Sequence, residues 1–156
     1  MPYQQERMIE LLRDVNRGLG KVVKEVVVSH DIPLGVMVAA REISADPGIT
    51  VSELSRRTGM AKSHISNIIR ALEMRGWVEK RPDPDDQRLL HLDLTPAAIQ
   101  QLRLVRSHIR ARLTALVEGI PAQKAADMMA GLEELQSVLK NDSARKIESG
   151  PDQSKP

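Results

Sequence analysis

Two neighbouring segments decide the fold: Thr50-Val-Ser-Glu-Leu-Ser-Arg-Arg-Thr-Gly59 and Lys62-Ser-His-Ile-Ser-Asn-Ile-Ile-Arg-Ala-Leu-Glu-Met-Arg-Gly76. In the first, Thr50 and Glu53 have the spacing of a capping box, in which the Thr50 hydroxyl accepts from the Glu53 backbone amide and the Glu53 side chain reaches back. Gly59 suits a left-handed helix end, and Gly76 ends the second segment. The pattern predicts two short helices joined by a tight turn, the second running over about 62–75.

The second helix has two chemically different faces. At about 100° per residue, its apolar side chains cluster within about a third of the circumference and must face a core: Ile65, Ile68, Ile69 and Leu72. The opposite face carries Ser63, Asn67, Arg70 and Met74, with Lys62 and Ser66 on one flank and His64 and Ala71 on the other. Arginine can donate two hydrogen bonds to guanine, asparagine can pair with adenine, and serine can reach bases or phosphates. These residue types favour a helix that reads base edges, and a solvated helix surface is the alternative.

A β-hairpin is expected next. Residues 77–80 and 89–94 have the pattern of two strands, because three leucines of the second alternate with polar residues. Residues 81–88 form a polar loop between them. Two helices joined by a turn and followed by a hairpin make a winged helix-turn-helix, whose second helix enters the DNA major groove.

Positive charge is concentrated around these elements. The net charge is only +2, but residues 56–81 carry seven basic and two acidic side chains, a local charge of +5, which leaves −3 for the rest. The expected phosphate contacts belong to this group: Arg56, Arg57, Arg75, Lys80 and Arg81. Because DNA phosphates attract such clusters, the segregation favours DNA binding. A winged-helix module that docks a partner protein is the alternative.

The hairpin tip has mixed charge. Gln87 and Arg88 are the candidates for the minor groove, where the potential is most negative. Asp83, Asp85 and Asp86 oppose that approach. We expect Asp86 to pair with a basic side chain and to shape the loop, which leaves an arginine free for DNA. A solvated turn is the alternative.

Long helices flank this region. Residues 8–28 carry an apolar stripe at spacings of three and four, and Pro33 opens a helix that reaches about Ala45. Thr95 caps a further helix that starts at Pro96, and Pro121 opens the last one.

The fold class expected is therefore mainly α, an α+β winged helix-turn-helix with N- and C-terminal helices forming a dimerisation region. We expect these parts: an N-terminal dimerisation helix in 1–30, a DNA-binding domain in 31–95, C-terminal dimerisation helices in 96–140, and a disordered tail in 141–156. The stripes are too long for the small central domain to bury, so we expect two copies to pair about a two-fold axis. An intramolecular bundle of the same helices is the alternative.

Composition excludes several other classes of function. The chain has no cysteine, so disulfides, cysteine-based zinc sites and iron–sulfur clusters are excluded. One Trp and one Tyr give few platforms for stacking single-stranded bases. The histidines form no close ligand pair in sequence, and no metal site or cofactor is expected: His30, His64, His91 and His108. No phosphate loop or nucleophile elbow is present, so no enzymatic activity is expected.

The chain is expected to be cytoplasmic and to have no membrane partner. Its longest uncharged apolar stretch, residues 33–40, is far shorter than the roughly 18–20 residues that cross a bilayer. No basic start followed by an apolar core marks a signal peptide.

The central region resembles the MarR family of transcriptional regulators. The resemblance runs through both quoted segments, from Asp46 to Gly76, and through the hairpin to Thr95, where Asp86-Gln87-Arg88 corresponds to the D-x-R wing signature of the family. It covers about 31–96, and the flanking helices follow the family order over about 3–140. The resemblance implies a homodimer on a pseudo-palindromic duplex, with the second helix in the major groove and the hairpin in the minor groove. Such proteins are usually repressors released by a small ligand.

Three positions depart from the family pattern. Ala61 stands where a capping serine is usual, a loss worth about 1 kcal/mol. Ala97-Ala98 replaces a polar-glycine pair, and the wing tip is acidic. By analogy, a ligand pocket is expected between the dimerisation helices and the DNA-reading domain, with Met37 and Val38 as weak lining candidates that could equally be plain core.

Overall fold

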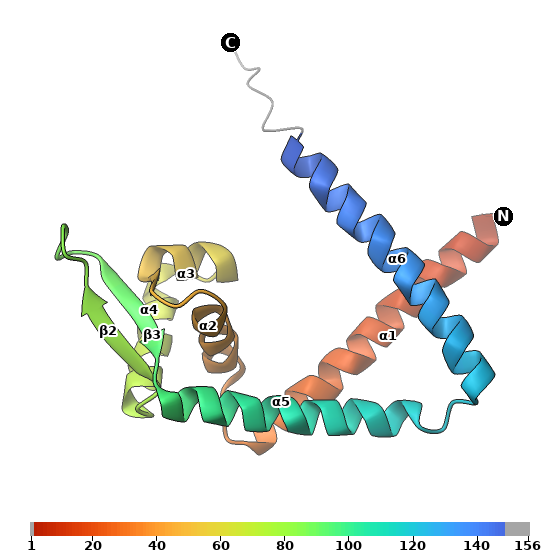
Figure 1. The fold of residues 1–156 in the computed structure, drawn as a ribbon, viewed down its shortest axis with the longest axis horizontal. Helices are drawn as coiled ribbons and strands as arrows, with labels where there is room; N and C mark the ends of the chain where they lie inside the picture. Colours follow the sequence, from red (N-terminus) through yellow and green to blue (C-terminus); the bar gives the residue numbers. More distant parts are fainter. Residues whose placement is uncertain (1, 149–156) are drawn as a thin grey trace, which may run out of the picture. The chain divides into compact units, whose positions relative to one another are not determined.

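The computed structural model describes the backbone of residues 2–148 and the side chains of residues 3–142. The elements follow in this order: α1 (Pro2–Ser29), α2 (Leu34–Ala45), β1 (Ile49–Thr50), α3 (Val51–Thr58), α4 (Lys62–Met74), β2 (Val78–Pro82), β3 (Leu90–Leu94), α5 (Pro96–Val117) and α6 (Ala122–Glu148) (Figure 1). The predicted class, mainly α with a winged helix-turn-helix, is confirmed. The chain divides into two compact units after Leu113.

The core of the first unit lies beneath α2, α3, α4 and the sheet. The four apolar positions predicted on the second helix are all buried, with exposed fractions of 5% or less. They pack with side chains from every neighbouring element, the largest fully buried ones being Val27, Ile32, Ile43, Leu54, Leu92 and Val105. This burial fixes which face of α4 points outward.

The sheet has three antiparallel strands in the order β1-β3-β2. Ile49 of β1 pairs with Leu92 of β3, and Val78 of β2 pairs with Leu94. β2 and β3 form the hairpin, here called the wing (residues 78–94), whose tip extends away from α3 and α4 in Figure 1. The sequence did not indicate β1, because a two-residue strand has no measurable periodicity.

The glycines end their helices as predicted. Gly59 has a φ of 69° after α3, and Gly76 has a φ of 66° after α4, in the left-handed region that favours glycine. The Trp77 amide then donates to the Leu72 carbonyl at 2.9 Å, and Trp77 is 8% exposed. The strand starts at Val78, one residue later than predicted.

The two predicted caps are present. The Thr50 hydroxyl accepts from the Glu53 amide at 3.2 Å, and Thr95 accepts from the Ala98 amide at 3.3 Å. The return half of the capping box was predicted wrongly. The Glu53 carboxylate instead binds Arg56 and Arg57, because charged guanidinium donors compete better for it than a backbone amide.

Two terminal boundaries differ from expectation. α1 begins at Pro2, so the helix is longer than the predicted 8–28. α6 continues to Glu148, so the prediction of disorder is wrong for residues 141–148, and residues 149–156 lie outside the described residues. Among residues 2–148, no helix has the apolar length that crossing a bilayer would require.

Candidate nucleic-acid interface

The outward face of α4 carries the residues predicted to read bases. All six are exposed: Lys62, Ser63, His64, Ser66, Asn67 and Arg70. Met74, one turn beyond Arg70, is 84% exposed. The Ser66 hydroxyl donates to the Lys62 carbonyl at 2.9 Å, so its oxygen stays available as an acceptor. Guanidinium, amide and hydroxyl groups are therefore offered together on one helix face.

Close packing against α2 sets the position of α4. A Cβ added at Gly35 on α2 would lie 3.1 Å from the Ile68 Cδ1 atom of α4. This distance is shorter than an ordinary van der Waals contact, so a larger side chain at Gly35 would press on the helix. The glycine allows the two helices to approach closely.

The start of α4 has no side-chain cap. Ala61 occupies the N-cap with φ −59° and ψ 146°, and no side chain accepts from the first free amides. The backbone already has the extended conformation that a capping serine adopts.

We therefore expect Ala61→Ser to stabilise the protein by about 0.5–2 kcal/mol. Urea unfolding followed by circular dichroism measures the change. Ala71→Ser in the middle of the same helix is the control, because a mid-helix serine satisfies no free amide and should give no gain. Equal midpoints for Ala61→Ser and the parent chain would contradict this account.

The predicted phosphate contacts on α3 are tied to carboxylates. Arg56 Nε lies 2.9 Å from Glu53 Oε2, and Arg57 Nε lies 2.9 Å from Glu53 Oε1. Arg57 also pairs with Asp46. Hydrogen bonds from the two arginines lower the pKa of Glu53 to about 2, and the bond from Arg56 has the larger effect. Glu53 raises the pKa of both arginines in return.

The other three predicted phosphate contacts also have internal partners. Lys80 Nζ lies 2.8 Å from Glu73, and Arg81 Nη2 lies 2.7 Å from Asp93. Arg75 Nη2 donates to the Asp31 carbonyl at 2.7 Å and its guanidinium lies 5.6 Å from the Trp77 ring centroid. All three remain exposed, so a phosphate could reach them. The sequence predicted correctly that these cations lie on the surface, but it did not indicate their partners.

Three further cations of the interface have no carboxylate partner among the described residues. Across residues 3–142, no ion pair involves the side chains of Lys62, Arg70 or Arg88. All three are exposed, two on α4 and one on the wing. Together with Arg75, which is bound to a carbonyl oxygen and lies near the Trp77 ring, these cations meet an incoming anion without first leaving a carboxylate.

The tip of the wing is built by aspartates that accept backbone hydrogen bonds. Asp86 Oδ1 accepts from the Arg88 amide at 3.0 Å. Asp86 therefore shapes the loop, but the predicted partner was wrong, since a backbone amide takes the place of a basic side chain. Asp83 Oδ1 accepts from the amides of Asp85 at 2.8 Å and Asp86 at 3.0 Å. Gln87 and Arg88 stay exposed beside this turn.

His91 was not predicted to have a role, and it lies at the base of the wing tip. Its Nδ1 lies 2.6 Å from the Gly48 carbonyl, and its Nε2 lies 2.8 Å from Asp83 Oδ2. The hydrogen bond to Asp83 is the main cause of a raised pKa for His91, and the same bond lowers the pKa of Asp83. No sequence signal joins positions 43 residues apart, and only the sheet register brings His91 beside the β1 turn.

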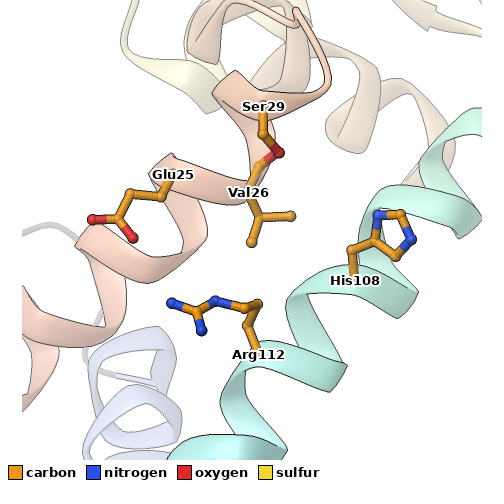
Figure 2. A pocket seen from close by; sticks show the side chains of 5 residues that line it. All are labelled: Glu25, Val26, Ser29, His108 and Arg112. Carbon is orange, nitrogen blue, oxygen red and sulfur yellow. The ribbon is translucent and has the colours of Figure 1, made fainter.

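A second histidine contact joins the turn after α1 to α5. His30 Nε2 lies 2.7 Å from His108 Nδ1, a proximity that sequence spacing did not indicate. Beside it is a pocket of about 340 Å³, where Glu25, Val26 and Ser29 of α1 face His108 and Arg112 of α5 (Figure 2). Met37 and Val38, the predicted lining residues, do not line this pocket, and Met37 packs against the core. Within the described part of the chain, no three histidine or carboxylate side chains come together as metal ligands.

Several known proteins are similar to this chain in sequence and in fold. Residues 39–90 match the model of the MarR family. The transcriptional repressor MprA of Escherichia coli is 30% identical over 108 residues, which span 67% of this chain and 60% of MprA. The match therefore covers less than two thirds of that relative's length.

Several solved structures have a similar fold. A transcriptional regulator of Thermotoga maritima has a TM-score of 0.78 at 20% identity, with 90% of this chain and 99% of that chain covered. FabT of Streptococcus pneumoniae, solved in complex with DNA, has a TM-score of 0.63 at 24% identity, with 87% and 97% covered. The element order, the exposed face of α4 beside a wing and the family model agree, and residues 39–90 form a MarR-family domain.

Proposed function

We propose that this protein is a transcriptional regulator that binds a specific duplex DNA sequence, and that it has no enzymatic activity. The observation that carries the proposal is the face of α4, where Ser63, Asn67 and Arg70 are exposed directly opposite a fully packed apolar face. Residues 31–95 supply the DNA-binding domain in this proposal. α4 enters the major groove, and Gln87 and Arg88 of the wing reach the minor groove. The DNA-bound structure of FabT supports duplex DNA as the ligand.

We propose further that the active form is a homodimer. The first two thirds of α1 have an apolar stripe exposed in the single chain: Met8 at 54%, Leu11 at 47%, Val15 at 56% and Leu19 at 43%. α6, in the second unit, exposes a stripe of its own: Met128 at 51%, Met129 at 61%, Leu132 at 57%, Val138 at 56% and Leu139 at 59%. Apolar stripes of this length on solvent-facing helices are typical of subunit interfaces. A dimer also doubles the number of DNA contacts.

Repression and ligand response complete the proposal. MprA is named a repressor, which supports repression rather than activation by this protein. The pocket between α1 and α5 in Figure 2 is the proposed site of a small effector, because it adjoins the His30–His108 contact. A molecule there would press on the junction between α1 and the DNA-binding domain, and would change how two copies of α4 are spaced.

Selection of bound sequences from a random duplex pool tests the function. We expect enrichment of two inverted half-sites with centres about 10–10.5 base pairs apart, or a multiple of that distance. Sedimentation equilibrium of the free chain should give twice its mass of 17.3 kDa. A chain carrying Asn67→Ala and Arg70→Ala should enrich nothing. Failure of the parent chain to enrich any sequence would instead favour a module that docks a partner protein.

A further inference from the structure

The base of the wing holds a histidine between two acceptors. His91 Nδ1 meets the carbonyl oxygen of Gly48, and Nε2 meets the carboxylate of Asp83, at 2.6 and 2.8 Å. The His91 and Asp83 side chains are 27% and 21% exposed, so both are partly shielded from water. The ring therefore bridges the wing tip to the turn before β1.

Only the imidazolium satisfies this arrangement. A neutral imidazole has one N–H and can donate to one of the two oxygens, whereas the charged ring has two N–H groups. A carbonyl oxygen cannot donate in return. Asp83 is held in its ionised form, because its Oδ1 already accepts from two backbone amides, of Asp85 and Asp86. The proton that completes both bonds therefore resides on His91.

Neighbouring charges leave this proton in place. Arg81 lies opposite His91 across the β2–β3 pair and its repulsion opposes the charge, but the Arg81 guanidinium binds Asp93. Asp46, on the β1 side, is occupied by Arg57. Asp83 is thus the carboxylate in direct contact with the ring, and its attraction outweighs Arg81, since the pKa of His91 is raised.

The contacts of His91 with Gly48 and Asp83, here called the tether, fix the loop that carries the minor-groove residues. One carboxylate of Asp83 connects the ring to the amides of Asp85 and Asp86, and Asp86 in turn accepts from the Arg88 amide. We propose that the His91 imidazolium is a positioning residue that holds the wing where Arg88 can contact DNA, so that this contact weakens when His91 loses its proton. This inference rests on the proposed function.

The pH dependence has a defined sign. The pKa of His91 is raised on folding, so the tether is complete below the unfolded value of about 6.5 and is lost as pH rises through the folded pKa. The pKa of Asp83 is lowered, so the tether also requires a pH above the folded pKa of that carboxyl. DNA affinity should therefore fall as a solution is made more alkaline than the folded pKa of His91.

The first experiment measures the His91 pKa in the free protein by following its ring proton with NMR from pH 5 to 9. We expect a value above the ordinary value of about 6.5 in the parent chain, and a lower value in Asp83→Asn, which keeps the shape but removes the charge. A His91 pKa at or below the ordinary value would overturn the proposal. This measurement needs no DNA, so it judges the tether even if the chain binds no duplex, an outcome that would contradict only the proposed function.

The second experiment measures duplex affinity by fluorescence anisotropy over the same pH range at constant ionic strength. Every chain compared carries His64→Gln, so that the exposed histidine of α4 does not contribute. With His91 intact, affinity should fall by up to about tenfold across its titration. With His91→Gln in addition, affinity should be low at every pH and the profile should be flat. The same pH profile with and without His91 would overturn the positioning role.

Discussion

Replacing Arg70 by alanine is expected to abolish discrimination at one base pair of each half-site, at a cost of about 1–3 kcal/mol per site. The guanidinium lies on the exposed face of α4 and carries no ion pair among the described residues, so both of its donor edges are free for a guanine. Competition binding between the selected duplex and one altered at that base pair measures the loss. Arg70→Lys should recover little, because an ammonium group cannot form the two parallel bonds.

Arg110→Ala is the matched control for this change. Arg110 is an exposed arginine on α5, so its removal takes away the same charge without touching α4. The ratio of affinities for the two duplexes should then equal that of the parent chain. If Arg70→Ala also preserved this ratio while weakening both affinities, Arg70 would contact phosphate rather than a base.

Replacing Leu72 by alanine should lower the free energy of unfolding by about 2–5 kcal/mol. The Leu72 side chain is fully buried on the inner face of α4, so its loss leaves a cavity in the hydrophobic core. Because each kcal/mol shifts the melting temperature of a chain of this size by about 2–4 °C, calorimetry should show a clear decrease.

Met74→Ala on the same helix gives the comparison. Met74 is 84% exposed, so its truncation should change stability by no more than about 0.5 kcal/mol. Equal losses for Leu72→Ala and Met74→Ala would mean that α4 does not present the face described here. The pair therefore tests the orientation of the helix without any DNA.

The orientation of α4 could be predicted because its determinants are local. Ile65, Ile68 and Leu72 recur at helical spacing, and Gly59 and Gly76 mark the neighbouring helix ends. Burial of one face then leaves only one face for solvent. The same logic identified Thr50 and Thr95 as caps, since a cap involves residues only three apart.

The partners of the charged groups could not be predicted, because they depend on which elements lie together. Arg75 reaches the Asp31 carbonyl 44 positions away, and His91 reaches Gly48 across 43. Asp86 was expected to take a basic side chain, but a backbone amide two residues away was closer. Sequence reasoning identified these groups as polar surface, and only the fold decides what they bind.

The carboxylates paired with Arg56, Arg57, Lys80 and Arg81 have a consequence for how the protein would respond to ionic strength. An arginine that is still held by a carboxylate brings little net charge to the duplex and displaces few of its condensed counterions. Four cations per protomer have no carboxylate partner among the described residues and bring a full charge: Lys62, Arg70, Arg75 and Arg88. In a dimer these correspond to a slope of roughly −7 in a plot of log affinity against log salt concentration, shallower than a simple count of basic residues would give.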